Sequence, residues 1–195
     1  MIQARGLGRR FGDKRVLANL DLDVARGELL LVTGANGSGK TTLLRLLAGL
    51  IVPTAGTLEV AADRARIGFL AHEPLVYREL TPLENLDLYG RLYRIPERRE
   101  RIGMLLERYG LWEARRERAD SLSRGMLQRL ALCRTLLHDP ELLLFDEPFN
   151  ALDAAGVELL LGEVAGREQR TIVVASHQPE RIGELPSSRL ALSPG

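Results

Sequence analysis

Apolar residues along this chain occur in short continuous runs, in alternation with polar residues, and at helical spacing, as expected for an α/β protein. Short runs that are apolar throughout predict strands buried on both faces, as in a parallel sheet, at residues 29–33, 141–147 and 171–175. The alternation through Leu20, Leu22 and Val24 predicts a half-buried strand over residues 16–24. Shorter strands are expected at residues 1–7, 57–60, 66–70 and 189–192.

Helical spacing of apolar residues fills most of the chain between these strands. Helices are expected at residues 42–50, 82–94, 96–119 and 154–164, with another that is capped by Ser123 and ends before Pro140. Thr81, Pro82 and Glu84 fit a capping box with proline at the first helical position. The stretch 53–119 is therefore expected to be an insertion into the α/β core rather than a separate domain.

A glycine-rich loop joins the strand at 29–33 to the helix that follows it. It reads Gly34-Ala35-Asn36-Gly37-Ser38-Gly39-Lys40-Thr41 and fits the phosphate-loop pattern G-x-x-x-x-G-K-[ST] at every fixed position. The glycines let backbone N–H groups surround a polyphosphate, and the helix N-terminus favours an anion. Lys40 is expected to reach the β- and γ-phosphates, Thr41 to help hold Mg²⁺, and Thr42 to complete the nucleotide contacts.

Further candidate residues lie at strand ends. Asp146 and Glu147 end the apolar run at 141–147, where Asp146 could hold Mg²⁺ and Glu147 could polarise an attacking water; the alternative is a pair of solvated carboxylates. His177 follows the strand at 171–175 and could contact a γ-phosphate or lie in a surface loop. Phe11 precedes a turn, where it could stack on a purine base or pack against the core.

Composition narrows the class of protein only slightly. The chain has 195 residues and a formal net charge of +1, so bulk charge does not point to nucleic acid or to a membrane surface. Cys133 is the single cysteine, which excludes an intramolecular disulfide. No apolar run approaches the ~20 residues of a membrane span, and residues 1–10 lack a signal-peptide apolar core. These features suggest a cytosolic location.

Taken in order, the motifs resemble those of a nucleotide-binding subunit of an ATP-binding cassette (ABC) transporter. The resemblance rests on the phosphate loop, the region around His72, the signature Leu122-Ser123-Arg124-Gly125-Met126, Asp146-Glu147, Asn150–Asp153 and His177. It implies an α/β P-loop NTPase fold in a single domain, residues 1–195. Within that domain it implies a mostly parallel core sheet, an antiparallel β part, and a helical subdomain at about 81–138 inserted in the RecA-like core.

The resemblance also implies an activity and partners. The chain would hydrolyse ATP with Mg²⁺ and form a head-to-tail homodimer, clamping each ATP between one phosphate loop and the Ser123 and Gly125 of the other copy. Glu147 would be the general base, His177 the γ-phosphate sensor, Phe11 the adenine-stacking residue and His72 a residue at the metal site. Asp153 would contact the facing subunit. Transmembrane permease subunits would dock near His72 and the helical insertion, at the cytoplasmic face of a bacterial membrane, and no nucleic acid would bind.

Three positions depart from the common family pattern. His72 stands where glutamine is usual, and Arg124 and Met126 alter the usual L-S-G-G-Q signature. Several short segments, His72-Glu73-Pro74, Leu80–Leu86 and His177-Gln178-Pro179, resemble the ATP-binding subunit of the cytochrome c maturation (haem exporter) system. The alternative is a general exporter of drugs, lipids or polysaccharides, because the L-S-x-G-M signature also occurs there. The signature argues against a kinase or GTPase with only the phosphate loop, and no N-K-x-D motif is present.

Overall fold

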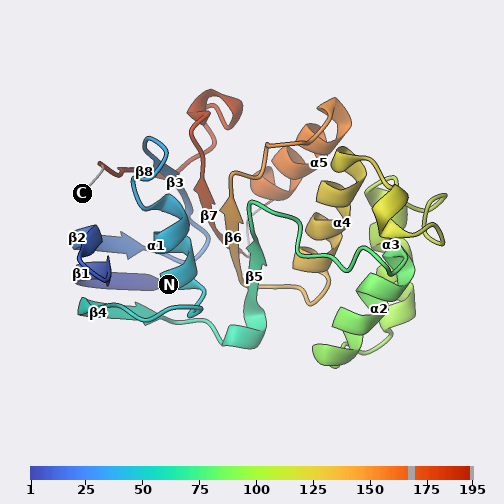
Figure 1. Ribbon diagram of the computed structural model, residues 1–195, viewed down its shortest axis with the longest axis horizontal. Helices are drawn as coiled ribbons and strands as arrows, with labels where there is room; N and C mark the ends of the chain where they lie inside the picture. The colour runs from blue at the N-terminus through green and yellow to red at the C-terminus, as the bar shows by residue number, and fades with distance from the viewer. Residues whose placement is uncertain (167–169, 194–195) are drawn as a thin grey trace.

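The computed structural model describes residues 1–166 and 170–193, which form two sheets with α-helices packed around them (Figure 1). One sheet is antiparallel, with strand order β2-β1-β4: β1 is Ile2–Phe11, β2 is Lys14–Val24 and β4 is Ala55–Val60. The other is parallel, with order β5-β6-β7-β3-β8: β3 is Leu29–Thr33, β5 is Ile67–Leu70, β6 is Leu142–Asp146, β7 is Thr171–Ala175 and β8 is Ser188–Ala191. The predicted fold class, a mostly parallel core sheet with an antiparallel part, is confirmed.

The parallel sheet separates two hydrophobic cores. Along β3, Leu29 and Leu31 belong to one core, whereas Leu30 and Val32 belong to the other. The same alternation holds along β6 and β7. Since successive side chains of a strand point to opposite faces, strands that are apolar throughout must be covered on both sides. In Figure 1, α1 and the antiparallel sheet lie on one side, and α2 to α5 lie on the other.

Five α-helices lie in the described part of the chain. They are α1 (Lys40–Leu47), α2 (Pro82–Leu92), α3 (Arg98–Arg108), α4 (Arg124–Leu136) and α5 (Ala154–Ala165). At the start of α2, the Thr81 hydroxyl accepts from the Glu84 amide and the Glu84 carboxylate accepts from the Thr81 amide, so the capping box is confirmed. Ser123 caps α4 through its side chain, as expected, and the side chain of Asp153 caps α5 in the same way.

Three helices end earlier than predicted. The helix expected at 82–94 ends at Leu92, the one expected at 42–50 ends at Leu47, and the one expected at 96–119 ends at Arg108. α1 and α3 each end two residues before a glycine in the left-handed region. This glycine is Gly49, with φ 66°, after α1 and Gly110, with φ 63°, after α3. At the second, the Leu111 amide donates to the Leu106 carbonyl, and the Gly110 amide donates to the Glu107 carbonyl. This pairing is the Schellman motif, which satisfies the last carbonyls and ends the helix.

The prediction that residues 53–119 form an insertion into the α/β core is wrong for the residues of β4 and β5. β4 pairs with β1 in the antiparallel sheet, and β5 pairs with β6 at the edge of the parallel sheet. Both strands are therefore part of the two sheets. Phe11, expected in the connection between two strands, is instead the last residue of β1.

A buried carboxylate ties the helical part to the strands. The side chain of Glu163 on α5 is 5% exposed and accepts hydrogen bonds from the Tyr109 hydroxyl at 3.0 Å and from Arg170 at 3.2 Å, with Arg108 2.7 Å away. Burial, together with the Glu163 charge, raises the pKa of Tyr109 far above its ordinary value, so it remains a hydrogen-bond donor. The two arginines neutralise a charge that would otherwise be costly to bury.

Candidate functional site

An open cavity of about 470 Å³ lies over the N-terminus of α1. Eight of the residues that line it come from the predicted site: Asn36, Gly37, Gly39, Lys40, Thr41, Thr42, His72 and Glu147. The structure thus brings together the phosphate loop, the end of β6 and the segment after β5, which are far apart in the sequence. Lys14 and Val16, which were not predicted as site residues, complete the lining from β2.

The loop backbone has the conformation that a phosphate cradle requires. Gly34, Gly37 and Gly39 have φ values of 150°, 83° and 98°, in the region that side chains disfavour. Gly39 is also closely packed, because a Cβ there would lie 2.8 Å from the Leu17 side chain. Gly37 is open, with nothing within 4 Å of such a Cβ. The loop therefore packs against β2 at Gly39 and leaves Gly37 open for a ligand.

Lys40 is the first residue of α1 and points back across the loop. Its ammonium donates to the Gly34 carbonyl at 2.8 Å and the Ala35 carbonyl at 3.3 Å, and its Nζ lies 3.4 Å from Oε1 of Glu147. The Lys40 and Glu147 side chains are only 7% and 12% exposed. The lysine is thus held at the centre of the loop by groups that an anionic phosphate could replace.

Glu147 links the carboxyl ends of β6 and β7. Its φ of 50° is unusual for a residue other than glycine, and its amide donates to the Ala175 carbonyl at 2.9 Å. Oε2 accepts from the His177 backbone amide at 3.2 Å and lies 2.8 Å from Nδ1 of His177. Nε2 of His177 lies 3.1 Å from the side-chain amide of Gln178. With that amide donating, His177 carries its proton on Nδ1 and donates it to Glu147.

Asp146 lies one residue earlier and is almost fully buried. Burial raises the pKa of this carboxyl, whereas a hydrogen bond with Thr41 and the nearby His72 lower it. Its Oδ1 has no hydrogen-bond partner in the described part of the chain, and neither does the buried Ser38 hydroxyl. Mg²⁺ prefers oxygen ligands, so the donor set fits this ion through Thr41 and Asp146 better than through the imidazole of His72.

Phe11, Ser123 and Gly125 were also predicted as site residues but are not among the residues that line the cavity. Phe11 is 47% exposed at the hairpin that carries Lys14, with the Arg9 guanidinium 4.5 Å from its ring centroid. Ser123 is exposed at the N-terminus of α4, and a Cβ on Gly125 would lie 3.4 Å from the Ala151 carbonyl. The signature therefore packs beside the segment that leads into α5, and its exposed face is available to another molecule.

Lys14 is a charged lining residue that no sequence motif marked. It lies on β2, outside any recognised pattern, and pairs across the hairpin with Phe11. One signal was present in the composition: Lys14 and Lys40 are the only lysines of the chain, and both line the same cavity.

Sequence comparison relates most of the chain to known proteins. A family model described as "ABC transporter" matches residues 17–150. The ABC transporter ATP-binding protein NatA of Bacillus subtilis is 35% identical over 213 residues, covering 100% of this chain and 87% of NatA. The daunorubicin resistance ATP-binding protein DrrA3 of Streptomyces coeruleorubidus is 42% identical, with 80% and 52% covered. The bacitracin transport ATP-binding protein BcrA of Bacillus licheniformis is 34% identical, with 95% and 64% covered.

Solved structures show the same fold. A structure described as the ATP-binding subunit of an ABC transporter superposes with a TM-score of 0.90 at 25% identity, covering 98% of this chain and 85% of that chain. An ATP-binding cassette solved as a dimer in a post-hydrolysis state with ADP and Pi superposes with a TM-score of 0.85 at 27% identity, covering 98% and 94%. None of the helices in the described part of the chain has the length and apolarity needed to cross a bilayer.

Proposed function

The chain belongs to the ABC transporter family and carries its ATPase domain, and from this premise we propose that it is the ATP-hydrolysing subunit of a bacterial exporter. The supporting observation is the Lys40–Glu147–His177 network beside the phosphate loop. The residues fit ATP: the loop offers backbone N–H groups, Lys40 offers a cation, and Asp146 and Thr41 offer oxygen ligands. A bound Mg²⁺ would neutralise phosphate charge at these oxygens.

ATP binding would redistribute the contacts of Lys40. In the structure its ammonium is shared between loop carbonyls and Glu147. The β- and γ-phosphates carry more negative charge than a single carboxylate and would draw the ammonium to themselves. Glu147, kept in place by the His177 backbone amide, would then be free to accept a proton from the attacking water.

A second copy of the chain would complete the site. Ser123 and Gly125 are not among the residues that line the cavity of their own chain. Both lie at the N-terminus of a helix, α4, where Ser123 is exposed and Gly125 is partly exposed. Such an N-terminus favours an anion. A head-to-tail pairing would bring it to the γ-phosphate held by the other copy, with Asp153 nearby. The dimeric state of the structural relative with ADP and Pi supports this arrangement.

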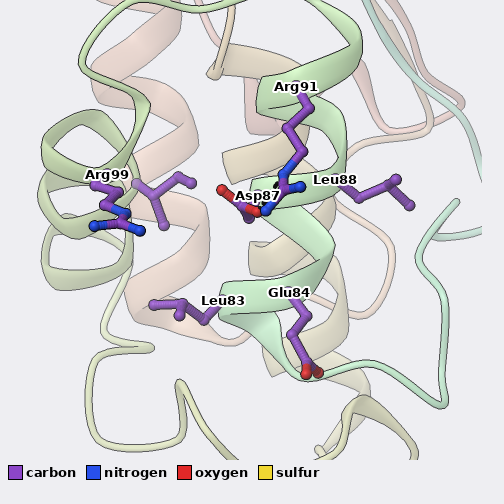
Figure 2. A pocket seen from close by; sticks show the side chains of 7 residues that line it. Leu83, Glu84, Asp87, Leu88, Arg91 and Arg99 are labelled. Carbon is purple, nitrogen blue, oxygen red and sulfur yellow. Dashed lines mark hydrogen bonds and ion pairs between the residues drawn. The ribbon is translucent and has the colours of Figure 1, made fainter.

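We further propose that membrane subunits dock on the helical part of the chain. Of the nine exposed large hydrophobic residues in the described part of the chain, six lie between residues 75 and 104: Leu75, Tyr77, Leu83, Leu92, Tyr93 and Met104. Among them Leu83 borders a groove of about 470 Å³ between α2 and α3 (Figure 2), which Leu88 and Ile102 also line. An apolar groove of this kind is typical of a protein contact.

Charge indicates which partner the groove suits. Asp87 already pairs with Arg91 at 2.7 Å and with Arg98 at 2.6 Å, and Glu84 is held in the capping box. Arg99, on the α3 side of the groove, has no ion pair among the described residues (Figure 2). The groove therefore fits an amphipathic helix of a permease that carries apolar side chains and a carboxylate.

Leu83→Glu tests this docking surface. Leu83 is 40% exposed in the first turn of α2, where an acidic residue favours the helix, so the variant is expected to fold. A buried carboxylate in the contact would remove most of the chain from the membrane fraction of cells, without changing its ATPase activity when purified.

Met104→Glu is the matched control. Met104 is 52% exposed on α3 but does not line the groove, so this variant is expected to remain with the membranes. Equal distribution of both variants between membrane and supernatant would contradict docking at the groove.

For the cargo, we infer a bulky amphipathic compound that the cell exports. Two of the relatives are named for daunorubicin resistance and bacitracin transport. Haem export for cytochrome c maturation is the second candidate, favoured by the His72-Glu73-Pro74 and His177-Gln178-Pro179 segments. The Leu80–Leu86 segment also resembles the haem exporter subunit, but three of its residues have structural roles. Thr81 and Glu84 cap α2, and the Asn85 side chain forms two hydrogen bonds with the Tyr77 backbone. They therefore carry little information about cargo.

A strain whose only copy carries Glu147→Gln separates the two cargoes. We expect the growth-inhibiting concentration of daunorubicin or bacitracin to fall at least about fourfold, while covalent haem in c-type cytochromes stays normal. Loss of c-type cytochromes with unchanged drug tolerance, and with the variant present at normal levels, would contradict the proposal and favour haem export.

A further inference from the structure

Lys14 is the cation in the cavity that no recognised motif explains. It lines the cavity together with Asn36, Gly37 and Gly39 of the phosphate loop, but it comes from the antiparallel sheet. We propose that Lys14 is an additional nucleotide-binding residue that contacts the phosphate nearest the ribose. This inference rests on the proposed ATP site and adds a contact from a second sheet.

The packing of β2 on the loop fixes where Lys14 stands. A Cβ on Gly39 would lie 3.1 Å from the Val16 carbonyl and 3.2 Å from Val16 Cγ1, so β2 rests directly on the loop. The pairing of β1 with β2 is irregular between Arg9 and Arg10, which lets both Val16 and Leu17 reach Gly39. Lys14, two residues before Val16, lines the cavity with it, as expected for side chains on the same face.

The charge of Lys14 is available for a ligand. No ion pair joins it to an acidic residue in the described part of the chain, and its side chain is exposed. The other lysine, Lys40, is already engaged by Glu147 and by two loop carbonyls. Lys14 is thus the uncommitted cation that an approaching polyphosphate meets in this cavity.

The hairpin places Lys14 at the end of the site nearer the base. Phe11, the candidate for stacking on adenine, is its cross-strand partner in β1. Lys40 contacts Glu147, and this carboxylate would act at the terminal phosphate. A lysine beside the base-stacking residue would therefore contact the first phosphate rather than the terminal one.

Substitution gives a direct test with a matched control. Lys14→Gln is expected to raise the Kd for ADP and the KM for ATP about tenfold, with kcat within about twofold, because a charge-assisted contact to a partly exposed phosphate is lost. Lys14→Arg retains the charge and should retain most of the affinity. Arg15→Gln removes the same net charge one residue later, at an exposed position that does not line the cavity.

Equal effects of Lys14→Gln and Arg15→Gln would show that only net charge matters, which would overturn the proposal. An unchanged Kd for ADP in Lys14→Gln would overturn it as well. Neither result would affect the phosphate-loop assignment, which depends on Lys40.

Because the chain has only two lysines, selective ¹³C-lysine labelling tests the ATP site at Lys40 and the phosphate contact of Lys14 in one spectrum. ADP should shift the ε-methylene signals of both Lys14 and Lys40, whereas adenosine should leave that of Lys14 unchanged. A shift of Lys40 alone would retain the ATP site and overturn the role of Lys14. No shift of either signal would overturn both, and an equal shift of Lys14 with adenosine would overturn the phosphate contact.

Discussion

Lys40→Ala is expected to weaken ATP binding by about 100-fold, which corresponds to roughly 2.7 kcal/mol. The ammonium is the cation at the centre of the phosphate loop, and charge-assisted hydrogen bonds to phosphate are among the stronger ones in proteins. The substitution also leaves the nearly buried Glu147 without its cation, so a carboxylate then faces the phosphates and repels them. Isothermal titration calorimetry with ATP measures the change.

Two controls separate this effect from unfolding. Thermal unfolding without nucleotide shows whether the variant still folds. Adenosine, which lacks phosphate, should bind the variant and the unchanged chain equally. If Lys40→Ala bound ATP with unchanged affinity, Lys40 would have no role at the phosphates and the loop assignment would fail.

Glu147→Gln is expected to lower kcat for ATP hydrolysis by about 10³-fold while ATP binding is kept. A side-chain amide cannot accept the proton of the attacking water, and a positioned general base contributes 10²- to 10⁴-fold. The amide retains the shape of the carboxylate and an oxygen that accepts from the His177 backbone. It no longer attracts Lys40 as an ion, so the lysine turns to the phosphates at a smaller cost.

Phosphate release from a single turnover gives the hydrolysis step, and equilibrium binding gives the affinity. Glu180→Gln is a suitable control, because it makes the same change at a position beyond His177 that lies outside the cavity. A Glu147→Gln chain that hydrolyses ATP at the normal rate would show that another group is the base.

The fold could be predicted where local sequence patterns mark the positions of strands and the starts of helices. Runs that are apolar on both faces marked β3, β6 and β7, and side-chain caps marked the starts of α2 and α4. The ends of α1 and α3 could not be located from apolar spacing, because the spacing continues past Gly49 and Gly110 while the backbone turns left-handed there. Both glycines stand in the sequence where a left-handed residue would end a helix.

The site residues of each motif could be predicted from the sequence, but the contacts between motifs could not. The phosphate-loop pattern located Lys40 and Thr41, and a strand end located Asp146 and Glu147. The ion pair of Lys40 with Glu147 joins residues 107 positions apart and depends on the strand order β5-β6-β7-β3-β8, which local patterns do not encode. Lys14 was missed for the same reason, because its place in the cavity depends on how the antiparallel sheet packs on the loop.

Two copies of the chain would share each ATP between Lys40 of one copy and the signature of the other. Sedimentation velocity of Glu147→Gln with saturating ATP and Mg²⁺ tests this shared site, since slow hydrolysis preserves the ATP-bound state. We expect a dimer with ATP, a monomer with ADP, and a monomer when Ser123→Arg is added to block the exposed face of the signature. A Glu147→Gln chain that stays monomeric with ATP bound, or that dimerises equally well with Ser123→Arg, would contradict the shared site.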